Sequence, residues 1–185
     1  MGVCRGMRCA AGLTTEALRP LLRLAAVPPK KNPPATASPV WKGHTQAIYY
    51  RDKRGGEPVN DFLEQLLVTS PAASAKIDDY VEEHLNGRSP SAPEPEFPIT
   101  SQIEGELREL RVRFAKTRYR VLYQRSANLV VLLHAFEKNT GAVSTSDKAK
   151  AQERFADFQA RMDAKARVPP RAAGHDAPPK ARRRP

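Results

Sequence analysis

The sequence ELRELRVRFAKTRYRVLYQRSANLVVLLHAFEK, residues Glu106 to Lys138, decides the fold. It contains three strand-like runs, Glu106–Phe114, Tyr119–Gln124 and Leu129–Phe136, separated by short turns. The first run alternates apolar and charged residues, as does a strand with one buried face. Strands joined by such short turns must be antiparallel. The third run is almost wholly apolar, which predicts a central strand covered on both faces.

Residue periodicity predicts four further elements around this meander. A short aromatic strand and two helices with apolar residues at helical spacing precede it, and a third helix follows it. The resulting order, β-α-α-β-β-β-α, predicts an α+β fold with a small, mostly antiparallel sheet packed on helices. We expect the helices to cover one sheet face and leave the basic strand residues on the other. The predicted segments are Gln46–Arg51 for the strand, and Pro58–Leu67, Ala72–Leu85 and Ser146–Met162 for the helices.

The formal net charge of +11 is concentrated in the two ends of the chain. Residues 1–44 hold seven Lys or Arg and one acid, residues 166–185 hold six and one, and residues 45–165 hold eighteen of each. Most of the 17 prolines lie in 20–39, 90–98 and 169–185. We therefore expect a disordered, basic, proline-rich extension over 1–44, a folded domain over 45–165 and a disordered basic tail over 166–185.

The charges of the predicted domain are segregated along its sequence. From Glu57 to Glu106 there are eleven acids and two bases, whereas from Arg108 to Arg125 there are seven bases and one acid, Glu109. A fold that keeps these two segments apart has a strongly positive face, as nucleic-acid-binding surfaces do. The alternative is that the arginine-rich hairpin is a solvated strand face, which is the commoner fate of charged residues.

Several polar and aromatic residues have a structural interpretation. His134 lies in an apolar run, so we favour a core histidine over a catalytic one. His84 ends a helix, where it suits the helix dipole. Tyr119 and Tyr123 share a strand face with an apolar residue and are expected to pack in the core rather than stack on bases.

The sequence predicts neither a metal ion nor a cofactor. The acidic residues from Asp78 to Glu83 have the spacing of a solvated helix face and no histidine partner. Cys4 and Cys9 form no metal-ligand pattern and no disulfide framework for the domain. No apolar run has the length of a membrane span, so we expect a cytoplasmic protein that does not bind membranes.

Three motifs of the meander resemble a known family. They are Leu107-Arg-Glu-Leu-Arg, Tyr119-Arg-Val-Leu-Tyr and Leu132-Leu-His-Ala-Phe-Glu-Lys-Asn-Thr140. They are similar to the pattern L-W-E-L-R, Y-R-V-L-Y and L-L-H-x-F-x-K-K-T of the phage-derived HigB-like branch of the RelE/ParE toxin superfamily, in which a terminal helix follows. The predicted element order agrees with this RelE-like fold.

The resemblance implies the toxin of a type II toxin–antitoxin system, an mRNA interferase that cuts mRNA on the ribosome and blocks translation. Such metal-independent endoribonucleases align the RNA 2′-hydroxyl with the scissile phosphate and stabilise the transition state with Lys and Arg. Guanidinium groups suit this role because they stay protonated and bind phosphate oxygens bidentately. The implied partners are mRNA, the ribosome and a cognate helix-turn-helix antitoxin that would mask the basic face.

The resemblance also assigns roles to residues at matching positions. Arg120 would contact the phosphate, Lys138 the phosphate or the leaving oxygen, and Arg111 would neutralise transition-state charge. These are the expected catalytic residues. The expected RNA-binding residues are Arg113, Arg118, Lys116 and Arg108.

Two positions depart from the family pattern. Asn139 replaces its second lysine, and no tyrosine follows Lys138. Catalysis would then rest on orientation and charge, with a contribution from the ribosome. Two alternatives remain open: a RelE-fold module that binds RNA or protein without cleavage, and a ParE-like toxin that acts on gyrase. The Leu132–Lys138 ending favours the HigB-like branch over the ParE-like one.

Overall fold

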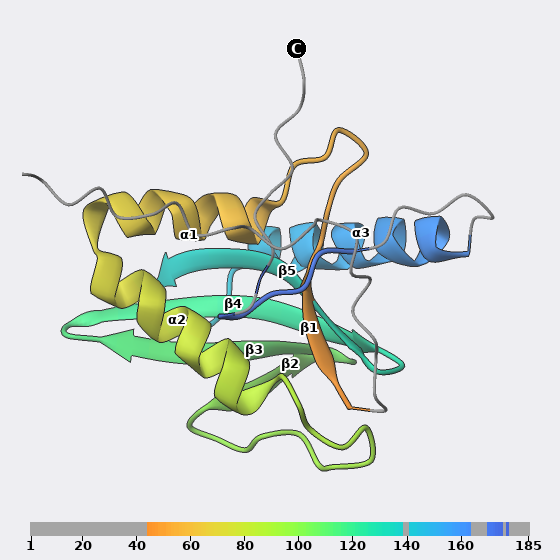
Figure 1. Cartoon of the computed structure of the whole chain (residues 1–185), viewed down its shortest axis with the longest axis horizontal. Helices are drawn as coiled ribbons and strands as arrows, with labels where there is room; N and C mark the ends of the chain where they lie inside the picture. The colour runs from red at the N-terminus through yellow and green to blue at the C-terminus, as the bar shows by residue number, and fades with distance from the viewer. Residues whose placement is uncertain (1–43, 139–140, 164–169, 176, 178–185) are drawn as a thin grey trace, which may run out of the picture. The chain divides into compact units, whose positions relative to one another are not determined.

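The computed structural model describes residues 44–138, 141–163, 170–175 and 177, and it confirms the predicted α+β class. The described elements run β-α-α-β-β-β-β-α, which is one strand more than the sequence predicted (Figure 1). They are β1 (Gln46–Tyr49), α1 (Pro58–Thr69), α2 (Pro71–His84), β2 (Thr100–Glu104), β3 (Leu107–Phe114), β4 (Thr117–Ser126), β5 (Leu129–Lys138) and α3 (Thr145–Met162).

The unpredicted strand, β2, forms a hairpin with β3. Glu104 pairs with Leu107, so that Gly105 and Glu106 form the turn, and Gly105 has a φ of +53°. Glycine adopts this left-handed conformation without the steric cost that a Cβ atom would add. Because β2 is an edge strand with little apolar sequence, hydrophobic alternation does not reveal it.

The five strands form one sheet in the order β1-β5-β4-β3-β2. The pairs β2–β3, β3–β4 and β4–β5 are antiparallel, as the meander requires, and β1 runs parallel to β5. The apolar strand β5 is an interior strand, as predicted, although β4 is the middle one. Strands β4 and β5 are longer than predicted, and the turn between β3 and β4 shortens to Ala115 and Lys116.

The helices cover both faces of the sheet, so the expectation that they all lie on one face was wrong. On the first face, α1 and α2 pack over residues such as Leu110, Val121 and Leu132, and α2 crosses in front of the strands in Figure 1. On the second face, Ala151, Phe155 and Phe158 of α3 pack over a second set of residues, which includes Leu122, Val131 and Leu133. The apolar residues of β5 point to both faces, so burying them requires a helix on each side.

Residues 170–175, for which the sequence predicted disorder, lie along the free edge of β1. The Tyr49 N–H donates to the Arg171 carbonyl at 3.0 Å, and the Ala173 N–H donates to the Ala47 carbonyl at 2.9 Å. Arg171 also forms a 2.6 Å ion pair with the buried Glu57 carboxylate. An edge strand offers unpaired backbone groups, and a buried carboxylate requires a cation, so this short segment is held despite its composition. Of the predicted extension over 1–44, residues 1–43 lie outside the described residues, and so does most of the rest of the predicted tail.

Tyr119 and Tyr123 are buried in the core on the first face, which confirms their packing role. Among the described residues, none of the helices combines the length and the apolar character needed to cross a bilayer.

Candidate functional site

Five cationic side chains gather on the second face of the sheet, the face of α3. Strand alternation points them to the same side as Leu107 and Leu122, which pack in the α3 core. The register sets Arg111 opposite Arg120, Arg113 opposite Arg118, and Arg118 opposite Lys138. We call this set, Arg111, Arg113, Arg118, Arg120 and Lys138, the basic cluster. It includes all three expected catalytic residues and two of the four expected RNA-binding residues.

Among the described residues, one buried carboxylate, that of Glu109, lies among these cations. Its Oε2 is 2.9 Å from the Nε of Arg120, and its Oε1 is 3.6 Å from the Nε of Arg111. The Ser101 hydroxyl donates to the same Oε1 at 2.8 Å. In the part of the chain that the structure describes, the cluster forms ion pairs with no other carboxylate. Like charges placed directly opposite each other in a sheet are destabilising, so the cluster holds an excess of positive charge at a cost to folding.

Arg120 is the innermost member of the cluster. Arg120 is only 5% exposed, and its Nη1 donates to the Tyr119 carbonyl at 3.2 Å. The contact with Glu109 is an ion pair by distance, but its angle is poor for a hydrogen bond. Burial lowers the pKa of the Arg120 guanidinium; Glu109 opposes this shift, and Arg111 adds to it. Arg120 therefore supplies positive charge from beneath the surface, whereas Arg113 and Arg118 are exposed.

Lys138 closes the cluster at the end of β5, where it is partly buried. Burial lowers the pKa of its ammonium group. Glu109 opposes this shift, whereas Arg120 and Arg111 lower the pKa further. An ammonium group with a lowered pKa gives up its proton more readily, which is the property required of a general acid. The neighbouring Asn139, where the family pattern has a lysine, lies outside the described residues.

His134 lies on the same face but is engaged in a structural network. Arg154 of α3 donates from Nη1 to the Leu133 carbonyl at 2.7 Å and to His134 Nδ1 at 3.2 Å. Because arginine can only donate, Nδ1 must accept, and the ring proton is on Nε2, which lies 3.1 Å from Asp147 Oδ1. The non-catalytic interpretation is therefore favoured, although His134 joins β5 to α3 rather than lying in the apolar core. Burial lowers its pKa, which keeps the ring neutral near pH 7.

The structure separates Arg108 from the other expected RNA-binding residues. Arg108 points to the first face, where its Nε is 3.8 Å from Glu94. Arg125 ion-pairs with the same carboxylate, and the Tyr123 hydroxyl donates to it at 3.1 Å. Successive residues of a strand point to opposite faces of the sheet, so Arg108, which is next to Glu109 in β3, faces away from the basic cluster. Lys116 is exposed in the turn between β3 and β4.

Two neighbours of the basic cluster, Glu109 and Phe97, were not predicted from the sequence. The role of Glu109 could have been recognised, because it is the one acid among the seven bases of Arg108–Arg125. Nothing in the sequence pointed to Phe97, because it lies in the proline-rich loop before β2. It is 73% exposed, and the centroid of its ring is 4.7 Å from the guanidinium carbon of Arg111.

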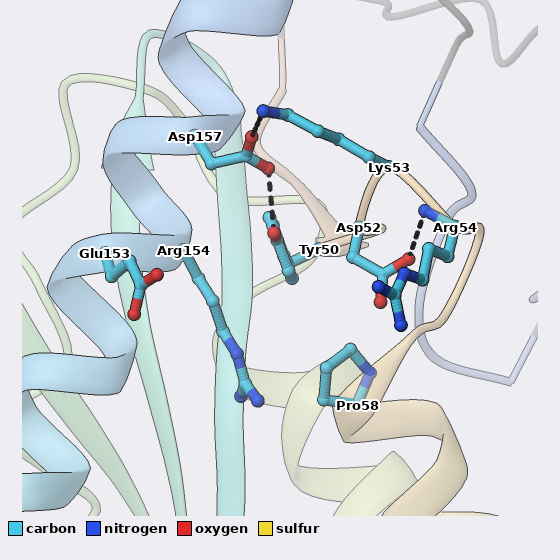
Figure 2. A pocket seen from close by; sticks show the side chains of 8 residues that line it. All are labelled: Tyr50, Asp52, Lys53, Arg54, Pro58, Glu153, Arg154 and Asp157. Atoms are coloured by element: carbon cyan, nitrogen blue, oxygen red, sulfur yellow. Dashed lines mark hydrogen bonds and ion pairs between the residues drawn. The ribbon is translucent and has the colours of Figure 1, made fainter.

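A separate pocket of about 520 Å³ lies between the turn after β1 and helix α3 (Figure 2). Its charges balance, with three cations and three carboxylates. The Tyr50 hydroxyl donates to Asp157 at 2.7 Å, and Lys53 lies 3.8 Å from the same carboxylate. Burial, together with Asp157, raises the pKa of Tyr50 to about 12. The residues that line the pocket are Tyr50, Asp52, Lys53, Arg54, Pro58, Glu153, Arg154 and Asp157, and none of the expected site residues is among them.

No group of His, Cys, Asp or Glu within the described ranges could hold a metal ion. The basic cluster instead has the chemistry of an anion site. Arginine and lysine donors preorganised on rigid strands can bind phosphate and stabilise negative charge that develops on it.

Comparison with known proteins relates part of the chain to a described family. No curated protein matches the chain. A family model does match it, over residues 66–156, a stretch that begins in α1, ends in α3 and contains the whole basic cluster. The family is described as phage derived protein Gp49-like (DUF891). Over this stretch the chain is thus similar to the phage-derived Gp49-like proteins.

Proposed function

We propose that this chain is the toxin of a type II toxin–antitoxin system, of the HigB-like branch of the RelE/ParE superfamily, and that it cleaves mRNA on the ribosome. The Gp49-like match supports a phage-derived, toxin-related protein. The observation that carries the proposal is the basic cluster, in which two of the five cations, Arg120 and Arg111, pair with the buried carboxylate of Glu109, and the other three form no ion pair with a carboxylate of the described residues. Such a surface recovers its electrostatic cost when it binds an anion, and RNA phosphate is the anion that fits arginine donors.

In the proposed reaction the RNA 2′-oxygen attacks the adjacent phosphorus, and the bond from phosphorus to the 5′-oxygen breaks. The products are a 2′,3′-cyclic phosphate and a 5′-hydroxyl. Exposed Arg113 and Arg118 bind flanking phosphates, while Arg111 and Arg120 stabilise the charge of the pentavalent transition state. Lys138 gives its proton to the 5′-oxygen, and the proton of the 2′-hydroxyl passes to water.

A second candidate function is an RNA-binding module that does not cleave, and one observation favours it. Within the described part of the chain, the groups beside the cluster that could take the 2′ proton are engaged. Both ring nitrogens of His134 have partners, and Glu109 is buried between Arg120 and Arg111. Tyr119 and Tyr123 belong to the opposite face. A nuclease built this way depends on orientation, on charge and on groups of the ribosome.

The proposal extends to the protein's partners. Both the toxin and its antitoxin would act in the cytoplasm. The antitoxin, a small helix-turn-helix protein, would bind the basic cluster through an acidic surface and so mask it. Charge complementarity of this kind increases the association rate and the specificity of a complex.

The deciding experiment induces the full chain in cells and maps the 5′ ends of mRNA. New ends phased with codons are expected for the wild type and are expected to be largely lost for Lys138→Ala and Arg120→Ala. Arg108→Ala is the matched control, because it removes a cation from the opposite face and leaves Glu94 paired with Arg125. Circular dichroism shows whether the Arg120 variant folds; Lys138 is less buried, so its variant reports on chemistry.

Each outcome has a distinct meaning. Growth arrest without new codon-phased ends would overturn the nuclease and favour the binding module. Equal cleavage by wild type and by folded Lys138 and Arg120 variants would overturn the assignment of the site.

A further inference from the structure

Phe97 presents an aromatic ring to solvent beside the basic cluster. The residue is 73% exposed, whereas Phe155 and Phe158 are buried in the α3 core. The guanidinium of Arg111 lies over the ring, with its carbon 4.7 Å from the ring centroid, in a cation–π contact. Because most of the residue remains exposed, Arg111 leaves ring surface free for a second planar group.

The backbone around Phe97 is held by hydrogen bonds. The N–H groups of Ile99 and Thr100 donate to the Glu96 carbonyl at 3.0 and 3.2 Å, and the Arg111 N–H donates to the Ile99 carbonyl at 2.7 Å. The Thr100 hydroxyl donates to the carbonyl of Pro95, a buried residue. The exposed ring is therefore part of a preorganised surface, and a ligand that stacks on it does not have to order the loop.

We propose that Phe97, with Arg111 beside it, forms a subsite for one unpaired nucleobase of single-stranded RNA. The inference rests on the proposed function, since the phosphates of the same strand would lie on the basic cluster. In a nucleotide, one sugar separates the base from its phosphate. On the protein, the exposed ring of Phe97 lies directly beside Arg111 of the basic cluster, so the same nucleotide could reach both. Aromatic platforms combined with a positively charged groove are the usual means of binding single strands without reading their sequence.

The charge around Phe97 favours RNA over a protein as the occupant. A nucleotide offers a planar base to the ring and a phosphate to the adjoining cations within one unit, whereas a single apolar side chain would use the ring alone. Arg111 links the two requirements, because it contacts the ring and also belongs to the cluster. Phe97 thus defines a base-binding position next to the phosphate that Arg111 contacts.

The test measures binding of the full chain to a fluorescently labelled, single-stranded 2′-O-methyl RNA oligonucleotide. This probe lacks the nucleophilic 2′-hydroxyl, so it is not cleaved. Phe97→Ala is expected to weaken binding about tenfold, since one base stacked on an aromatic side chain contributes roughly that much. Phe97→Trp is expected to retain the wild-type affinity, because it keeps an aromatic face. Val68→Ala is the control, because Val68 is an apolar residue of α1 with 84% exposure.

Two further arms separate stacking from charge. On an oligonucleotide of abasic nucleotides the Phe97→Ala and wild-type affinities are expected to be equal, because there is no base to stack. The dependence of affinity on salt is expected to be unchanged in Phe97→Ala and reduced in Arg118→Ala, which removes a phosphate contact.

The outcomes distinguish the two proposals. If wild type binds the oligonucleotide, Arg118→Ala weakens binding and Phe97→Ala does not, the base subsite is overturned and the proposed function stands. That result would make a protein partner the candidate occupant of the ring. If wild type does not bind single-stranded RNA at all, the base subsite is overturned, whereas the proposed cleavage on the ribosome is decided separately by the mapping of mRNA 5′ ends.

Discussion

The two faces of the sheet carry arginines from the same strands but balance their charges differently. On the first face, Arg108 and Arg125 share Glu94, which also accepts a hydrogen bond from Tyr123. On the second face, Glu109 pairs with only two of the five cations of the basic cluster, Arg120 and Arg111. The first group has two cations for one carboxylate and joins the loop before β2 to the sheet, as a structural network does. The second has five cations for one carboxylate, and this larger excess of positive charge is what an anion site needs.

The largest expected effect comes from removing the carboxylate on each face in turn. Glu109→Gln is expected to lower the free energy of unfolding by about 3 kcal/mol, because it leaves Arg120 buried without a counter-charge. Glu94→Gln is expected to cost about 1 kcal/mol or less, because its partners are more exposed to water. Urea unfolding of the two variants measures the difference. Equal losses would mean that the two faces do not differ as their burial indicates.

An intermediate effect is expected when one cation is removed from each face. Arg118→Ala is expected to weaken single-stranded RNA binding about tenfold, because a hydrogen bond to a charged group contributes about 1.5–3 kcal/mol. It should also reduce the slope of log affinity against log salt by about one. Arg125→Ala, on the first face, should leave both quantities unchanged. Equal losses in the two variants would indicate diffuse attraction to the whole chain rather than binding at the cluster.

The smallest effect concerns pH and the network that joins β5 to α3. Burial lowers the pKa of His134 below its ordinary 6.5, so below that pH the unfolded chain binds its proton more readily than the folded one. Stability is therefore expected to decrease as the pH falls below about 6.5. The pKa of Asp147 is also lowered despite the opposing effect of burial, through its contacts with Ser144 and His134, so this carboxylate remains charged in the same range.

The matched variant is His134→Gln, whose amide can accept from Arg154 and donate to Asp147 but does not titrate. Thermal unfolding of wild type and variant between pH 5 and 8 measures the contribution. The variant is expected to lose less stability at low pH than the wild type does. An identical pH dependence would show that groups other than His134 cause the change.

Much of the fold could be predicted because it depends on local patterns. The alternation of Glu106–Phe114 and the apolar run of β5 identified a meander, and helical spacing identified all three helices to within one or two residues at most ends. Strand β2 and the segment 170–175 could not be predicted, since neither carries an apolar pattern of its own. Both are held by backbone bonds to a strand elsewhere in the chain, β3 in one case and β1 in the other.

The site was predictable in part for the same reason. Strand periodicity places Arg111 and Arg113 together, and the resemblance to the toxin family directed attention to Arg120 and Lys138. Phe97 was not predictable, because its neighbour Arg111 is brought to it only by the hairpin of β2 and β3. The burial of Arg120 was not predictable either, because its counter-charge, Glu109, comes from the adjacent strand.

The sequence by itself determined which segments become helices and strands, and that basic residues concentrate in one hairpin, because both follow from the order of residue types along the chain. Only the tertiary structure decided which of those cations remain without a carboxylate. Charges interact through space. The carboxylate of Glu94, in the loop before β2, pairs with both Arg108 and Arg125, whereas the carboxylate of Glu109, in β3, pairs with only two of the five cations of the basic cluster. The pairing of distant segments turned an arginine-rich hairpin into one structural network and one candidate phosphate site.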